Sequence, residues 1–134
     1  MQRRKVQDTH RPTDERQQQR AVVDAFLAAA RDGDFAGLLQ VLDPDLTWRS
    51  YTARGVVVRL GAAEVAGLAQ RGARAAVTAR RVLVNGEPGI VARGANGKPV
   101  GVMACTVVDG RIVEILSVTD PERLAAMDLP GRPD

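Results

Sequence analysis

General acid–base chemistry requires a histidine or a carboxylate held in a pocket, and the sequence offers few that fit. The only histidine, His10, has polar, aperiodic neighbours near the N-terminus, which are typical of a solvated side chain. Asp43 and Asp45 flank a proline at a helix-to-strand junction, and Asp109 precedes a glycine in a hairpin signal. Turn and capping roles explain these three aspartates.

Glu114 is the carboxylate best placed to enter the protein interior, because it stands in a strand-like apolar run. If Ile112 and Leu116 face the core, alternation puts Glu114 on the same face as a buried or pocket-facing acid. If Val113 and Ile115 face the core instead, Glu114 faces solvent. The sequence leaves both assignments open.

Two polar aromatic residues and one methionine are further candidates to line a pocket together with Glu114. Trp48 and Tyr51 lie close together in one strand, so that one of them could reach a cavity. Packing of Trp48 in the core, with its ring N–H hydrogen-bonded, is the alternative. Met103 shares a strand face with Cys105 and is expected at the core. If the chain is an enzyme, Glu114 and Tyr51 are its catalytic candidates; otherwise no catalytic residue is expected.

Metal, redox and phosphate chemistry find little support. Cys105 is the only cysteine, which excludes an intramolecular disulfide, and it lacks the Cys and His partners of a metal site. No glycine-rich phosphate loop is present. We therefore expect no metal and no cofactor. Five strand arginines would bind an anionic ligand only if several converge, and otherwise form a solvated face: Arg49, Arg59, Arg80, Arg81 and Arg93.

Hydrophobic spacing predicts the elements that would position these residues. Three- and four-residue steps predict helices, and alternation with β-branched residues predicts strands joined by Asn-Gly or Asp-Gly turns. The expected helices are 17–33, 35–42 and 61–72, and the expected strands are 45–52, 56–60, 76–85, 89–93, 99–108 and 111–119. This order puts about three helices on one face of a curved, mainly antiparallel sheet, an α+β architecture. A sheet curled around a helix encloses a cone, whose mouth is a natural small-molecule pocket.

The basic excess of the chain is confined to its N-terminal end. The 134 residues carry 19 basic and 16 acidic side chains, and the isoelectric point is about 9.7. Residues 1–20 hold six of the basic and three of the acidic groups, so the remainder is neutral overall. We therefore expect no direct DNA binding by the folded body. No apolar run approaches the roughly 18 residues of a membrane span, and we expect a one-domain, soluble, cytoplasmic protein.

Two segments carry a family resemblance: VVDAFLAAARDGDFAGLLQVLDPDLTWR (22–49) and VVDGRIVEILSVTDPERL (107–124). Together with the order of elements, they resemble the SnoaL-like branch of the nuclear transport factor 2-like (NTF2-like) cone fold. The resemblance implies a cystatin-like cone of curved sheet and helices. It does not fix a function, because the fold hosts isomerases, dehydratases, epoxide hydrolases, cyclases and noncatalytic binding domains.

A narrower resemblance is carried by VNGEPGIVAR (84–93), the DGRIVEI strand and the segment Asp120-Pro121-Glu122-Arg123-Leu124. These are similar to the C-terminal extension of SigJ-like extracytoplasmic-function RNA polymerase sigma factors, whose members commonly carry Asn-Pro-Asp-Lys-Leu at the last position. The resemblance implies a SnoaL-like domain at 16–129 and a C-terminal tail at 130–134. The basic tail at 1–15 would be the remnant of a linker after a sigma-factor DNA-binding region, in a detached domain or a fragment.

The same resemblance implies that residues 120–124 and the loop around Tyr51 to Gly55 contact sigma core domains or RNA polymerase. We therefore expect a noncatalytic regulatory domain that binds a ligand or a protein and modulates transcription initiation. The alternative is a small enzyme of the polyketide cyclase, ketosteroid isomerase or epoxide hydrolase type that acts on a hydrophobic metabolite. A monomer and a homodimer are both compatible with the sequence, since cone-fold domains often pair through their sheet faces.

Overall fold

A computed structural model of the chain describes residues 12–73, 78–84, 87–127 and 129. Its helices are α2 (Pro12–Asp32), α3 (Phe35–Val41), α4 (Ala62–Ala73) and α5 (Pro121–Ala126). Its strands are β1 (Leu42–Thr52), β2 (Gly55–Leu60), β3 (Thr78–Val84), β4 (Glu87–Arg93), β5 (Pro99–Val108) and β6 (Arg111–Val118). His10, most of the basic tail and residues 130–134 lie outside the described residues.

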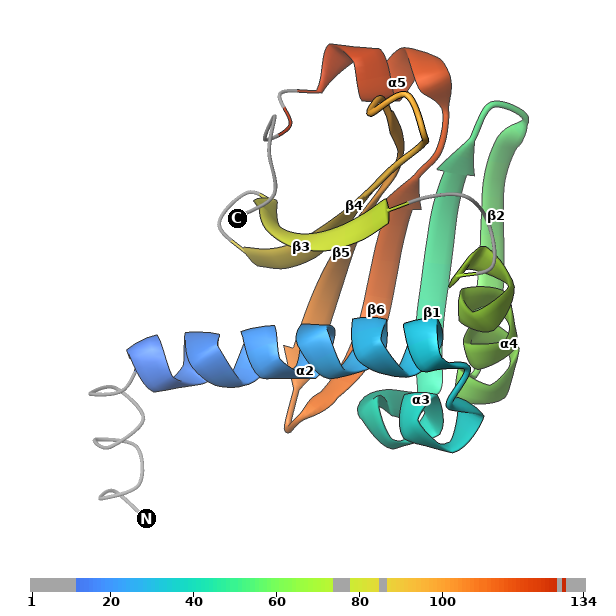
Figure 1. The fold of residues 1–134 in the computed structure, drawn as a ribbon. Helices are drawn as coiled ribbons and strands as arrows, with labels where there is room; N and C mark the ends of the chain where they lie inside the picture. Colours follow the sequence, from blue (N-terminus) through green and yellow to red (C-terminus); the bar gives the residue numbers. More distant parts are fainter. Residues whose placement is uncertain (1–11, 74–77, 85–86, 128, 130–134) are drawn as a thin grey trace.

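The strands form one curved six-stranded sheet in the order β2-β1-β6-β5-β4-β3. Every neighbouring pair is antiparallel except β1 and β6, which run parallel. Helices α2, α3 and α4 lie along one face of this sheet, and α2 crosses several strands (Figure 1). The expected α+β fold, a mainly antiparallel sheet wrapped on helices, is confirmed.

The main core lies between these three helices and the inner face of the sheet. Apolar side chains recur along α2 at helical spacing, so that one stripe of the helix faces the strands. Burial of this stripe against strand residues removes apolar surface from water and stabilises the fold. The core contains Val23, Phe26, Leu38, Leu42, Leu46, Val65, Ala66, Ile90, Cys105, Ile112 and Ile115.

A smaller cluster lies on the outer face, where α5 covers one end of the sheet (Figure 1). Leu124 of α5 packs against Val82, Val91 and Val102 there. The sequence analysis expected about three helices, and α5 is a fourth among the described residues. Its start has a local cause, because the Asp120 side chain accepts a hydrogen bond from the Glu122 backbone N–H and a proline follows the cap.

Several boundaries of the elements differ from the prediction by a few residues; β1, for example, begins at Leu42 instead of Asp45. The described part of α2 starts at Pro12, five residues before the predicted start at Gln17, and proline is suited to the first turn of a helix because its ring fixes a helical φ angle. The hairpin predicted at Asp109 and Gly110 joins β5 to β6, with φ values of 52° and 79° at these two residues. None of the helices in the described ranges is long and apolar enough to cross a membrane.

A β-bulge in β6 decides which face Glu114 occupies. Thr106 of β5 pairs with Glu114, whereas the next residue, Val107, pairs with Ile112, which leaves Val113 as an extra residue. The bulge shifts the alternation by one residue, so that Ile112 and Ile115 are both fully buried. Glu114 therefore points to the outer face, which corrects the assignment that would make it a pocket-facing acid.

Candidate functional site

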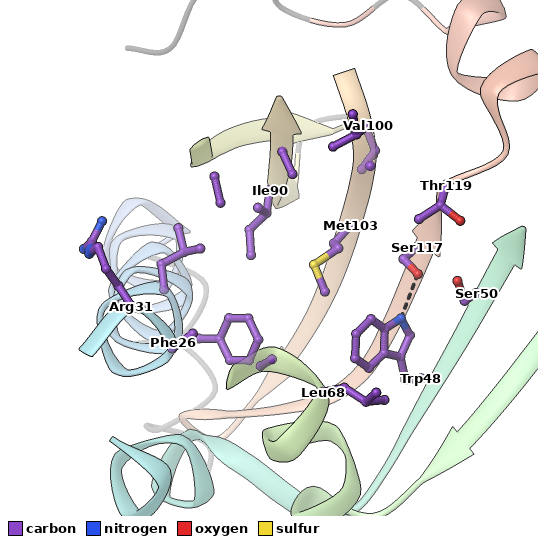
Figure 2. Close-up of a pocket in the computed structure, with 17 residues that line it drawn as sticks. Phe26, Arg31, Trp48, Ser50, Leu68, Ile90, Val100, Met103, Ser117 and Thr119 are labelled. Atoms are coloured by element: carbon purple, nitrogen blue, oxygen red, sulfur yellow. Dashed lines mark hydrogen bonds between the residues drawn. The ribbon is translucent and has the colours of Figure 1, made fainter. Parts of the chain in front are cut away.

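An open cavity of about 390 Å³ lies between α2, α4 and the inner face of the sheet (Figure 2). A volume of this size is in the range of small-molecule sites, which start at about 300 Å³. Most of its wall is apolar and comes from Phe26, Leu27, Ala30, Leu68, Ala69, Ala79, Ile90, Ala92, Val100, Gly101, Val102 and Met103. The cone is therefore not filled by its own side chains.

The polar atoms of the wall gather on the side formed by β1 and β6. Ser50, Ser117 and Thr119 bring three hydroxyl groups to this side, across the cavity from Phe26 and Ile90 (Figure 2). The cavity thus has one wall of hydroxyl groups, and the rest of its lining is apolar apart from Arg31.

One hydrogen bond fixes the centre of the polar wall. The indole N–H of Trp48 donates to the hydroxyl oxygen of Ser117 at 2.7 Å. An indole nitrogen is a donor only, so Ser117 must be the acceptor in this pair. Ser117 is 3% exposed, and the bond holds both its hydroxyl and the indole ring in place.

Strand alternation and one ion pair position the two walls. In β1, Leu46, Trp48 and Ser50 share the inner face because successive strand residues point to opposite sides. On the other side, Arg81 Nε of β3 lies 2.8 Å from Asp24 Oδ1 of α2. This contact ties α2 to the sheet beside the apolar wall.

Ionisable groups are sparse around the cavity. Among the described lining residues only Arg31 carries a charge; it is exposed, in the last turn of α2. Cys105 lies in the core beneath, 2% exposed, and burial raises the pKa of its thiol to about 12. A thiol with such a pKa stays protonated at neutral pH and is a poor nucleophile. Within the described ranges, no group of three or more His, Cys, Asp or Glu side chains could hold a metal ion.

The four pocket candidates of the sequence analysis separate into two pairs. Trp48 and Met103 line the cavity. Glu114 does not: its carboxylate lies on the outer face, where Oε2 is 3.8 Å from Arg49 Nη1 and the side chain is 41% exposed. Tyr51 is also outside, since it stands three residues after Trp48 and so points to the opposite face of β1.

Tyr51 instead meets the segment that was expected to contact a partner. The Arg123 guanidinium lies over the Tyr51 ring, 5.3 Å from its centroid, and Arg123 Nε is 3.5 Å from Asp120 Oδ2. The Tyr51 carbonyl accepts hydrogen bonds from the backbone N–H groups of Thr119, at 2.9 Å, and Asp120, at 3.3 Å. The end of β1 and the 120–124 segment therefore form one continuous surface at the edge of the molecule.

The strand arginines do not converge on a common site. Arg49 faces Glu114, Arg59 Nη1 is 3.1 Å from Glu64 Oε2, and Arg81 pairs with Asp24. Arg93 donates to a backbone carbonyl in the following turn, at 3.0 Å. None of them lines the cavity, so an anion-binding cluster of strand arginines is not formed in the described part of the chain.

Sequence reasoning missed the serine and threonine residues of the polar wall. Ser117 was not among the pocket candidates of the sequence analysis. The available signal was the pairing of two features: Trp48 needs an acceptor when buried, and Ser117 is the hydroxyl residue of the last strand. Their distance of 69 positions in the sequence concealed the contact.

Comparison of the sequence with protein-family models gives no match, and comparison with curated proteins gives none either. Solved structures do match. An NTF2-like protein from Burkholderia xenovorans is 23% identical over 81% of this chain and 94% of its own, with a TM-score of 0.56. The chain has the NTF2-like fold.

Two further solved structures share this NTF2-like fold. The Mycobacterium tuberculosis extracytoplasmic function sigma factor SigJ is 25% identical over 84% of this chain, with a TM-score of 0.63, and the match spans 46% of SigJ. An LEH-like epoxide hydrolase from M. tuberculosis is 22% identical over 83% of this chain and 89% of its own, with a TM-score of 0.52. Since the NTF2-like fold is common to proteins of different function, the role of this chain has to be inferred from its site.

Proposed function

We propose that the chain is a noncatalytic regulatory domain of an RNA polymerase sigma factor, which binds a small molecule in its cavity and contacts sigma core domains through α5. The observation that carries the proposal is the chemistry of the cavity. It is open and apolar, and its described lining residues include neither a carboxylate nor an imidazole. A site of this composition can bind a molecule but offers no general acid or base to transform it. The likeness to SigJ supports the transcriptional setting.

The surface around α5 is suited to hold a protein partner. Asp120 caps the helix, Leu124 anchors it to the sheet at 7% exposure, and Arg123 is fixed over Tyr51. Pro121 and Glu122 are exposed beside them. A guanidinium fixed over an aromatic ring loses little side-chain freedom on binding, and arginine and tyrosine are enriched at binding hot spots.

A small enzyme acting on a hydrophobic metabolite is the second candidate, and the open apolar cavity is the observation that favours it. The M. tuberculosis LEH-like epoxide hydrolase shows that the fold is compatible with catalysis in a neighbour. In this chain, however, the base that the enzyme hypothesis required, Glu114, faces Arg49 on the outer side. An enzyme would need to act through the hydroxyl groups of the polar wall alone, without an acid or base to activate them.

A binding experiment with purified sigma-factor core domains tests the proposal. We expect the wild-type chain to bind them, and Arg123→Glu to weaken binding at least tenfold, because it reverses the charge at the centre of the α5 surface. Arg111→Glu is the matched control, since Arg111 is an exposed arginine at the opposite end of β6. This control should bind as the wild-type chain does.

Two outcomes would contradict the proposal. Absence of binding by the wild-type chain would remove the sigma-factor role. An equal loss of binding in Arg123→Glu and Arg111→Glu would mean that only net charge matters, and would remove α5 as the contact surface.

A further inference from the structure

The Ser117 hydroxyl has a hydrogen atom that no group among the described residues accepts. Its oxygen accepts the Trp48 indole N–H, and within the described residues this is the one hydrogen bond of the side chain. A hydroxyl group can accept and donate at the same time. The Trp48 bond occupies the acceptor side and leaves the O–H free to donate.

This donor lies at the wall of the cavity. Ser117 is only 3% exposed and lines the cavity, so its hydroxyl meets solvent from the cavity side. A ligand that fills the cavity without an acceptor would leave this donor unpaired, which costs free energy, so a ligand with an acceptor atom at this point is favoured. Ser50 and Thr119 lie on the same side and extend the polar wall around this point (Figure 2).

The rest of the cavity selects against charge. Twelve of the described lining residues are apolar, and the single charged one, Arg31, is exposed and turned away from Ser117 (Figure 2). An ionised group beside Ser117 would be removed from water without a counter-charge, which is strongly unfavourable. A neutral acceptor oxygen is free of this penalty.

We propose that the cavity binds an uncharged, largely apolar molecule with one acceptor oxygen, such as a ketone, and that the Ser117 O–H donates to this oxygen. The inference rests on the small-molecule binding in the proposed function and specifies the chemical class of the ligand. Trp48 acts as a positioning residue, because its N–H fixes the Ser117 oxygen and thereby directs the O–H into the cavity.

A pair of matched probes tests the inference on the full chain. 2-Acetylnaphthalene has a flat apolar body and a ketone, and 2-isopropenylnaphthalene has the same shape with CH₂ in place of the oxygen. Trp48 is the only tryptophan of the chain and lies in the cavity wall, so its fluorescence reports occupancy directly. We expect Ser117→Ala to weaken binding of the ketone about tenfold and to leave binding of the alkene unchanged, which corresponds to one hydrogen bond.

The control is Thr106→Ala, which removes a hydroxyl from the outer face of the sheet, where Thr106 pairs with Glu114. It should not alter the affinity for either probe. Because Ser117→Ala leaves the Trp48 N–H without its acceptor and could destabilise the fold, the carbonyl stretch of the bound ketone provides a second measurement on the wild-type chain. We expect a lower frequency than the same ketone has in hexane.

Several results would overturn the inference. Equal effects of Ser117→Ala on ketone and alkene, or a carbonyl frequency equal to that in hexane, would exclude the Ser117 hydrogen bond while leaving small-molecule binding intact. Tighter binding of 2-naphthoate than of the ketone would exclude the preference for uncharged ligands. Failure of all three probes to change Trp48 fluorescence would exclude the ligand class, whereas the sigma-factor role is decided separately by the binding experiment with core domains.

Discussion

The inner and outer faces of the sheet both carry apolar side chains, but their polar groups lie in different surroundings. On the inner face, helices enclose Trp48 and Ser117, and their hydrogen bond is shielded from water. On the outer face, the polar groups of Arg49 and Glu114 lie 3.8 Å apart with side chains 40% and 41% exposed. Water screens the Arg49–Glu114 pair, so this ion pair contributes little to stability. The Trp48–Ser117 hydrogen bond lies in less polar surroundings, where making or losing a hydrogen bond changes the free energy more.

This contrast indicates that residue type alone does not locate a site in this fold. The outer face carries the Arg49–Glu114 pair, and Val56, Val58 and Leu60 are exposed beside it at 55%, 48% and 64%. The inner face has neutral hydroxyls in a cavity. Enclosure by α2 and α4, and not the strength of the polar group, makes the inner face the candidate binding site.

The largest expected effect comes from substituting two adjacent residues of β6 that face opposite sides of the sheet. Ile115→Ala should lower the free energy of unfolding by about 2–5 kcal/mol, because Ile115 is fully buried on the inner face and its loss leaves a cavity. Leu116→Ala should cost less than about 1 kcal/mol, because Leu116 is 38% exposed on the outer face. Urea unfolding of both variants measures the difference. Similar losses for the two would contradict the assigned faces and with them the bulge at Val113.

The second test uses the pH dependence of stability that Cys105 produces. Below pH 9.0 its thiol is protonated in the unfolded and the folded chain; between 9.0 and about 12 only the unfolded chain loses the proton. The unfolded state is favoured there, so stability should fall by about 1.4 kcal/mol per pH unit. Urea unfolding at about pH 8 and about pH 10.5 should therefore show a steeper decline for the wild-type chain than for Cys105→Ala. Parallel declines would mean that the inner face at Cys105 is accessible to water.

The smallest expected effect concerns the outer face. Glu114→Gln removes the charge opposite Arg49 and should change the free energy of unfolding by less than about 1 kcal/mol, with less effect at high salt. It should also leave the affinity for 2-acetylnaphthalene unchanged, because Glu114 does not line the cavity. A large loss of affinity would indicate that Glu114 contacts the ligand, and would support the enzyme hypothesis.

The sequence was sufficient for the fold because its signals are local. Helix stripes, hairpin pairs such as Asp109 and Gly110, and the alternation in β1 each arise from residues near one another in the chain. The alternation in β1 also predicts that Tyr51 points outward, since Tyr51 lies three positions after the inward-facing Trp48. The expectation that either aromatic residue could line a pocket did not use this information.

The site was less predictable because it depends on two non-local features. The face of Glu114 follows from the bulge at Val113, which is created by the register between β5 and β6 and has no glycine to signal it. The role of Ser117 follows from its contact with Trp48 across the parallel pair of β1 and β6. The start of α5 has a sequence signal, an aspartate cap followed by proline. The sequence analysis interpreted residues 120–124 as a contact segment and did not predict a helix there.

The most direct test of the central claim, that binding occurs on the enclosed inner face, is amide and indole chemical-shift mapping by NMR during titration with 2-acetylnaphthalene. We predict the largest shifts at the Trp48 indole N–H and at Ser50, Ser117 and Thr119, with small shifts along β2. The largest shifts along the exposed residues of β2, with the Trp48 indole resonance unmoved, would place binding on the outer face and contradict the account.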